Sequence, residues 1–420
     1  MRHVDSMLHP RNNIVFDISR SNRTKKGSEL SQVIALKEMD SCKDDGKSKP
    51  IKIRDFDETL LKLHADGNAL LNLEYQELDK LSPLYPMDVG SDLDHRADNR
   101  WTNIVPFDHS RVKLFAREGS GQHDYINANY IAGMDSSREY IATQGPLTKT
   151  IPEFWRMVWE QKSSAIVMLS EFEAIDKRTQ MMREKVARYY PDEEESNSYQ
   201  YDQIMVSRTG KLDTKDWEIR TLKLTHLTER KNRFVKHFFF KYWSDHEANI
   251  NPVDLIDFVR VVRAETSAQP TSPLIVHCSA GVGRTGTYIA VDYFNKYIQS
   301  LKLKLEKTDK RVQENWTVDI FGRVLNMRDK RRFMVQSKAQ YIFIYDVVQE
   351  LLRQAFKPNH PGNTTHVRHE NGDSSFTDAG SNASGPAKED AVYDDVESLQ
   401  GQITSSEEML IRISTGSSDV

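Results

Sequence analysis

The chain has 420 residues, of which 29% are charged and 38% are hydrophobic, and it contains two cysteines. Two cysteines exclude a disulfide-stapled scaffold and a cysteine-rich zinc module, so we expect a reducing compartment. No run reaches the roughly 20 apolar residues of a membrane span, and residues 1–41 lack the apolar centre of a secretory signal. These features predict a soluble, cytoplasmic protein.

Charge and composition divide the chain into three parts. Residues 1–54 carry a net charge of +5 and residues 357–420 a net charge of −7, whereas residues 55–356 are nearly neutral. Because the central part has no basic field, we expect no nucleic-acid partner. We predict a disordered basic segment over residues 1–50, one folded domain over residues 51–356, and a disordered acidic tail over residues 357–420.

The folded domain is predicted to begin with two short helices over residues 53–80. Apolar residues recur at helical spacing in this range. Asp55 and Glu58 have the spacing of a capping box, and Gly67 with Asn68 interrupts the apolar pattern before the second helix.

Apolar runs of strand length come next. Between the predicted strands Phe238–Tyr242 and Leu274–Val276, a helix is predicted to begin, because Asn251 is suited to be an N-cap and Pro252 to be a first helical residue. Another helix is predicted after Gly286, and a final one over residues 341–352. Strands alternating with helices predict an α/β fold, a single domain with a twisted mixed β-sheet flanked by helices. The predicted strands are Tyr140–Ala142, Ala165–Leu169, Phe238–Tyr242 and Leu274–Val276.

The most informative segment is HCSAGVGRTGT at residues 277–287, directly after the last predicted strand. A strand, a loop of small residues and a helix N-terminus direct backbone N–H groups into one concavity, which binds anions. Cys278 lies at its centre, where Arg284 and the helix dipole should stabilise a thiolate. A thiolate that faces a phosphate site is a nucleophile for phosphoryl transfer. The alternative is a buried structural cysteine beside an ordinary turn, which the full strand, loop and helix context disfavours.

This loop resembles that of the cysteine-dependent protein tyrosine phosphatases, and the resemblance covers roughly residues 55–356. The loop is shared with dual-specificity and low-molecular-weight phosphatases, but other segments are similar to the tyrosine-specific branch, especially to catalytic domains of receptor-type members. The resemblance implies a protein-tyrosine-phosphatase that hydrolyses phosphotyrosine in proteins through a cysteinyl-phosphate intermediate, acts in signal transduction and needs no cofactor. These segments are NRWTNIVPFDHSRVKL at 99–114, DYINANYI at 124–131, YIATQGPL at 140–147, FWRMVWEQ at 154–161 and VQSKAQYIF at 335–343.

The resemblance also implies roles around the nucleophile. Cys278 would attack phosphorus, and the planar fork of Arg284 would hold two equatorial oxygens. Thr285 would hydrogen-bond the sulfur as it leaves, and His277 is counted among the catalytic residues. The residues that bind the phosphoryl group would be Ser279, Ala280, Gly281, Val282, Gly283 and Arg284.

A proton donor must protonate the leaving oxygen. In the family this acid belongs to a Trp-Pro-Asp loop, and the matching stretch here is YWSDHEAN at residues 242–249, so Asp245 would be the acid. Lys185 would buttress this loop. Gln336 would position the hydrolytic water, with Gln340 as a second amide.

The substrate pocket should select a long aromatic group. Trp101 stands where the family pattern NRY has its stacking Tyr, and Asn103 matches the position that contacts the substrate main chain. No metal is required by this chemistry. The 13 histidines show no metal-ligand spacing, so we expect most of them to be surface or core residues.

Three substitutions and one longer stretch depart from the family pattern. Ser244 replaces a Pro, Glu247 replaces a Gly, and Trp101 replaces the Tyr. The charged stretch 302–315 also looks longer than usual, which suggests an extended helix or an exposed loop. These departures support a second hypothesis, a phosphotyrosine-binding pseudophosphatase with weak or no turnover. Retention of the nucleophile, the arginine, the acid and the glutamine favours an active enzyme.

The acidic tail carries two short interaction motifs. The end Ser418-Asp419-Val420 is of the kind that PDZ domains bind, and Tyr393 in an acidic context could bind an SH2 domain once phosphorylated. An inert solvated tail is the alternative for both motifs. The receptor-like resemblance also leaves open that the chain is the intracellular part of a membrane receptor whose span is absent from it.

Overall fold

A computed structural model describes residues 47–115, 123–175, 180–191, 197–245, 248–266 and 272–356. The predictions for both tails, including Tyr393 and the C-terminal motif, lie outside these residues. The helices in this part of the chain are α2 (Phe56–Leu81), α3 (Asp88–Ser91), α4 (Ile151–Glu160), α5 (Pro252–Thr266), α6 (Gly283–Lys304), α7 (Lys310–Gln313), α8 (Ile320–Lys330) and α9 (Lys338–Phe356), with the 3-10 helices η1 (Ile53–Asp55), η2 (Leu93–Asp98), η3 (Thr148–Thr150) and η4 (Leu305–Lys307).

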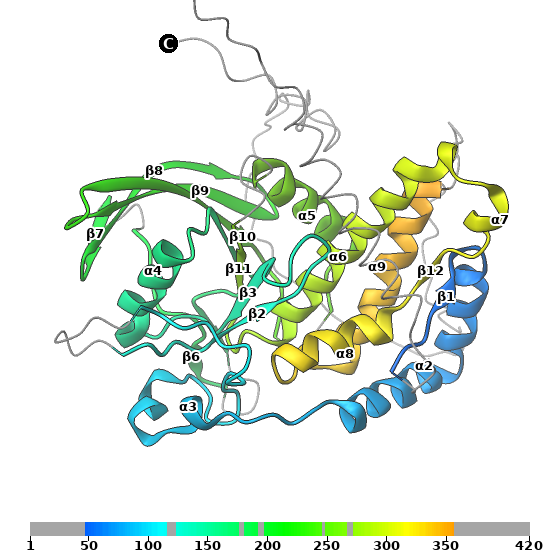
Figure 1. Ribbon diagram of the computed structural model, residues 1–420, viewed down its shortest axis with the longest axis horizontal. Helices are drawn as coiled ribbons and strands as arrows, with labels where there is room; N and C mark the ends of the chain where they lie inside the picture. Colours follow the sequence, from blue (N-terminus) through cyan, green and yellow to red (C-terminus); the bar gives the residue numbers. More distant parts are fainter. Residues whose placement is uncertain are drawn as a thin grey trace, which may run out of the picture. The chain divides into compact units, whose positions relative to one another are not determined.

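One mixed sheet of eight strands forms the centre of the domain, in the order β2-β3-β11-β4-β10-β9-β8-β7 (Figure 1). Strand β11 runs parallel to β3 and β4, β10 runs parallel to β4, and the other pairs are antiparallel. The predicted mixed sheet is therefore confirmed. The strands are β1 (Ile51–Lys52), β2 (Ala128–Ile131), β3 (Tyr140–Thr143), β4 (Ala165–Met168), β5 (Glu173–Ile175), β6 (Met182–Glu184), β7 (Ser198–Tyr201), β8 (Ile204–Asp213), β9 (Trp217–His226), β10 (Lys231–Phe240), β11 (Leu274–His277) and β12 (Thr317–Val318).

Each face of the sheet has its own apolar core. Helices α5, α6 and α9 lie side by side over one face (Figure 1), and their apolar side chains form a core with residues of β3, β4, β10 and β11. Helix α4 supplies the second core with residues such as Trp155 and Met157. Since both faces are covered, all four residues of β11 are buried, which explains its uninterrupted apolar run.

The predicted helix signals are mostly confirmed. Asp66, Gly67 and Asn68 all have positive φ, so the pattern break separates two helical segments inside α2. The Asn251 side chain accepts the Val253 amide at 2.9 Å and begins α5. The capping box is wrong, because Asp55 makes no capping hydrogen bond and pairs with its neighbour Arg54 at 3.2 Å instead.

Two further features concern the helices. Helix α6 extends into the charged stretch 302–315 and ends at Lys304, after which η4 and α7 follow. Among the described helices, none combines the length and the apolarity that crossing a bilayer requires.

Candidate active site

The predicted nucleophile lies at the carboxyl end of β11, between two parallel neighbours. Cys278 follows the strand directly and is 3% exposed, and α6 begins five residues later at Gly283. Ligand sites of parallel sheets lie at this edge, where strands end and helices begin. The fold therefore places the sulfur in a buried loop that leads into a helix N-terminus.

Gly281 is required by the path of this loop. Its φ is +72°, and a Cβ at this position would lie 2.1 Å from the carbonyl oxygen of Thr143, at the end of β3. Its amide N–H donates to Cys278 Sγ, with 3.3 Å between the two atoms. Any larger residue would therefore push the loop off β3 and move a donor away from the sulfur.

Arg331 holds this loop from behind. It is fully buried, and it donates to the carbonyl oxygens of Gly281 at 3.0 Å and Ala280 at 3.1 Å. It also donates to the side-chain oxygens of Asn129 at 2.7 Å and Asn127 at 2.8 Å. Burial lowers the pKa of the guanidinium to about 10, so it stays charged at neutral pH. By binding the carbonyl groups on one side, Arg331 leaves the loop amides available on the other.

Arg284 connects the loop to the predicted acid. It donates to the Trp243 carbonyl oxygen at 2.6 Å, and its Nη2 lies 3.2 Å from Asp245 Oδ1. The other carboxylate oxygen of Asp245 lies 3.2 Å from Lys185 Nζ. Arg284, Asp245 and Lys185 therefore lie together, and Arg284 belongs to the helix that follows the Cys278 loop. Ser170, which was not predicted, accepts a further bond from Arg284 at 3.2 Å.

His277 lies beneath the nucleophile. Its Nδ1 lies 3.2 Å from the Cys278 carbonyl oxygen, and its Nε2 lies 2.7 Å from the Tyr189 hydroxyl. Because a carbonyl oxygen only accepts, the proton sits on Nδ1, and Tyr189 donates to Nε2. The Tyr189 oxygen can then accept from His237 Nε2 at 2.6 Å. These hydrogen bonds fix the backbone at Cys278, so His277 acts on the position of Cys278.

Burial also determines the protonation state of the two histidines in this hydrogen-bonded series. It lowers the pKa of His277 to about 4, and the charges of Arg100 and Arg284 act in the same direction. Burial likewise lowers the pKa of His237 well below its usual value. Both imidazoles are therefore neutral near pH 7.

Gln336 and Gln340 pack against the start of α6. The Gln340 side-chain oxygen accepts the Gln336 amide at 3.1 Å, and a Cβ on Gly283 would lie within 3.4 Å of both residues. The Gln340 side chain is fully buried, and its Nε2 has no hydrogen-bond partner within the described residues. Both glutamines therefore lie at Gly283, where the loop after Cys278 leads into α6.

Trp101 is half-buried, and the Arg183 guanidinium lies over its ring at 4.4 Å from the centroid. The preceding residue, Arg100, donates to the carbonyl oxygens of Gly145 at 3.2 Å and Pro146 at 2.7 Å and so fixes the segment. Asn103, two residues further, is exposed.

The remaining predicted residues differ in how they are held. Ser279 and Thr285 are buried, and their hydroxyl groups have no hydrogen-bond partner among the residues that the structure describes. The Ser244 hydroxyl, at the substituted position of the acid loop, accepts from Asn249 at 3.2 Å. Glu247 lies outside the described residues.

One family profile and several named proteins are similar in sequence to this chain. The sequence profile described as Protein-tyrosine phosphatase matches residues 95–350. The chain is 37% identical over 308 residues to Receptor-type tyrosine-protein phosphatase eta of Gallus gallus, with 73% of this chain and 20% of that protein covered. It is 37% identical over 304 residues to Tyrosine-protein phosphatase Lar of Drosophila melanogaster, with 72% and 14% covered.

A third relative carries a different name. The chain is 36% identical over 328 residues to Phosphatidylinositol phosphatase PTPRQ of Homo sapiens, with 77% of this chain and 13% of that protein covered. The chain thus spans about a fifth or less of the length of these curated relatives.

Proposed function

Because this chain belongs to the protein-tyrosine phosphatase family, we propose that it hydrolyses phosphotyrosine in proteins. One observation carries the proposal: the Arg284 guanidinium contacts the Asp245 carboxylate at 3.2 Å, while its own helix starts at the loop of Cys278. Nucleophile, anion-binding arginine and acid therefore face one site, as phosphoryl transfer requires.

In the first step the Cys278 thiolate attacks phosphorus, and the bond between phosphorus and the tyrosine oxygen breaks. Asp245, in its protonated form, gives its proton to that oxygen, so neutral tyrosine leaves. Arg284 and the loop amides hold the three equatorial oxygens of the phosphoryl group. The product is a phosphocysteine at residue 278.

In the second step a water molecule attacks the phosphocysteine. The Asp245 carboxylate takes a proton from this water, the sulfur leaves as thiolate, and inorganic phosphate is released. Gln336 is placed to orient the water, because it packs beside Gly283 at the start of α6. The buried hydroxyl of Thr285 is available to bind the sulfur as it leaves.

The substrate pocket would be walled by Trp101, with Asn103 contacting the peptide main chain. A half-buried indole offers an aromatic face to the phenyl ring of phosphotyrosine. The alternative, a phosphotyrosine-binding pseudophosphatase, finds less support, because Cys278 and Asp245 are both present and Asp245 contacts Arg284, whose helix follows the Cys278 loop.

Turnover of a phosphotyrosine peptide by the purified chain tests the proposal. We expect phosphate release by the parent and none above background by Cys278→Ser, because a hydroxyl is a far weaker nucleophile than a thiolate. Both proteins should still bind the peptide. Equal phosphate release by the two proteins would contradict the proposal that the chain is an enzyme. Peptide binding by the parent without phosphate release would favour the pseudophosphatase.

We further infer that the catalytic domain extends over residues 51–356, beyond the family match. Support comes from β1, which pairs with β12, and from α2, which packs against α9. Binding of a PDZ domain to Ser418-Asp419-Val420, and of an SH2 domain to phosphorylated Tyr393, are proposals that rest on the motifs alone. A cytoplasmic location, as the intracellular part of a receptor, is proposed from the receptor-type names of the relatives.

A further inference from the structure

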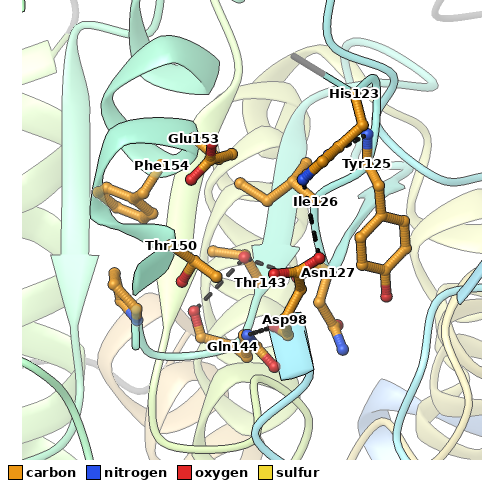
Figure 2. Close-up of a pocket in the computed structure, with 11 residues that line it drawn as sticks. Asp98, His123, Tyr125, Ile126, Asn127, Thr143, Gln144, Thr150, Glu153 and Phe154 are labelled. Atoms are coloured by element: carbon orange, nitrogen blue, oxygen red, sulfur yellow. Dashed lines mark hydrogen bonds and ion pairs between the residues drawn. The ribbon is translucent and has the colours of Figure 1, made fainter. Parts of the chain in front are cut away.

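A second group of ionisable side chains lies behind the phosphate loop. His95 and Asp98 belong to η2, and His123 precedes β2; one ligand atom from each lies within 4.8 Å of the other two. Figure 2 shows Asp98 and His123 facing one another in a pocket that Thr143 also lines. Thr143 is the residue on which Gly281 packs, so the pocket adjoins the loop from below.

The two histidines converge on one carboxylate oxygen. Asp98 Oδ2 lies 3.3 Å from His95 Nδ1 and 3.7 Å from His123 Nε2. The other oxygen, Oδ1, pairs with Lys149 Nζ at 2.8 Å. Asp98 is 6% exposed, whereas both histidines reach solvent in part. Oδ2 is therefore the oxygen available to a ligand that enters from the histidine side.

The side chains of this cluster are held in place by their surroundings. The His95 ring stacks on Tyr125, with 4.2 Å between centroids and 18° between planes. The Asp98 main-chain oxygen accepts from Gln144 Nε2 at 2.7 Å. A ligand that binds here meets side chains that have already lost most of their freedom, which reduces the entropic cost of binding.

We propose that His95, Asp98 and His123 bind a divalent transition-metal ion of the Zn²⁺ type. Two imidazole nitrogens and one carboxylate oxygen are ligands that Zn²⁺ prefers, and three protein ligands leave a fourth position for water. Coordination through His123 Nε2 places the proton on Nδ1 and costs the hydrogen bond from the Tyr125 amide. That bond is 3.3 Å long, so the cost is small.

The Gln144 side chain connects the proposed metal site to the segment that walls the substrate pocket. Gln144, which binds the Asp98 carbonyl, also accepts the Arg100 amide at 2.9 Å, next to Trp101. The ion would thus cross-link η2 to the segment before β2, directly behind the residues that wall the substrate pocket.

Zn²⁺ titration of the full chain by calorimetry tests the proposal. The experiment uses Cys278→Ser as the parent, because the Cys278 thiolate is itself a zinc ligand. The parent should bind one more Zn²⁺ than the double variant His95→Asn, His123→Asn. Asp98→Asn should weaken binding by more than about tenfold, since it removes the central ligand.

His109→Asn is the matched control, because His109 is an exposed histidine that belongs to no such cluster within the described part of the chain. It should bind Zn²⁺ as the parent does. Melting temperatures without metal check that each variant folds, and added Zn²⁺ should raise the melting temperature of the parent more than that of the double variant. If the double variant binds as many Zn²⁺ ions with the same affinity as the parent, the proposal is wrong.

Discussion

The two halves of the active site are held in different ways. The nucleophile loop is buried and fixed by backbone contacts: Ser279 O accepts the Gly145 amide at 2.9 Å, and Val282 O accepts the Val335 amide at 3.1 Å. Asp245 on the acid side is 34% exposed in its side chain, and ion pairs with Lys185 and Arg284 hold its carboxylate.

This difference has a consequence for substrate binding. Backbone contacts within the fold fix the geometry of the nucleophile loop, which amounts to electrostatic preorganisation of the proposed phosphate site. Arg284, in contrast, contacts Asp245, and in the proposed mechanism it also binds the phosphoryl group. An incoming phosphoryl group therefore competes with the Asp245 carboxylate for one guanidinium. Substitutions on the acid side should alter turnover with little loss of stability, and substitutions behind the loop should alter both.

The largest effect on turnover is expected for Asp245→Asn. An amide cannot protonate the tyrosine oxygen, so kcat/KM on a phosphotyrosine peptide, which reports the step in which tyrosine leaves, should fall by about 10² to 10⁴, the usual contribution of a general acid. The loss should shrink for an aryl phosphate whose phenol is acidic, because such a leaving group needs no proton. The free energy of unfolding, measured in urea, should stay nearly unchanged.

Asp216→Asn is the control for this variant. Asp216 is a partly buried aspartate at the end of the β8–β9 hairpin, where its carbonyl accepts the Lys241 amide, and it has no contact with Arg284. Its turnover should match that of the parent. A drop in kcat/KM that is equally large for both kinds of leaving group would show that Asp245 does not protonate the leaving oxygen.

The next effect, on stability and turnover together, is expected for Arg331→Met. The substitution leaves the carbonyl oxygens of Gly281 and Ala280 and two asparagine oxygens buried without a donor. We expect a loss of about 3 kcal/mol in the free energy of unfolding, together with lower kcat at temperatures where the variant is folded. Urea unfolding and peptide turnover measure the two quantities.

The neighbouring Arg332→Met is the matched control. Arg332 is only partly buried and lies over the ring of Phe333 at 4.4 Å. Its removal should change neither quantity appreciably. If Arg331→Met kept parental stability, the loop would not depend on support from behind, and the contrast between the two halves would be lost.

The sequence predicts the nucleophile half of the site well where the signals are local. An apolar run of strand length, a loop of small residues and a glycine at a helix start all lie within residues 274–287, and the structure confirms the strand and the helix. The capping box at Asp55 is wrong because spacing alone does not determine which partner a carboxylate meets.

Residues that act from a distance could not be predicted in this way. Arg331 stands in the charged run RDKRR, which is typical of a solvated surface, and only the fold buries it. Tyr189 and His237 reach His277 from separate strands and loops, and His95 and His123 are 28 positions apart. Such groups depend on strand order and register, which local patterns do not specify.

The smallest expected effect is a pH dependence of the free energy of unfolding, which comes from the two buried histidines beneath the nucleophile loop. Because burial lowers the pKa of His277 to about 4, the unfolded chain binds more protons than the folded one between that value and about pH 6.5. Stability is therefore fully present above pH 6.5 and falls as the pH decreases. His277 alone should cost about 2 kcal/mol between pH 7 and pH 5, and His237 adds a loss of the same sign.

The variant His237→Gln separates this contribution from that of other groups. A glutamine amide can still donate to the Tyr189 hydroxyl, but it does not titrate, so the decrease in unfolding free energy from pH 7 to pH 5 should be smaller than in the parent. His109→Gln, at an exposed site, should keep the parental slope. Parallel curves for the parent and His237→Gln would mean that His237 is not held neutral.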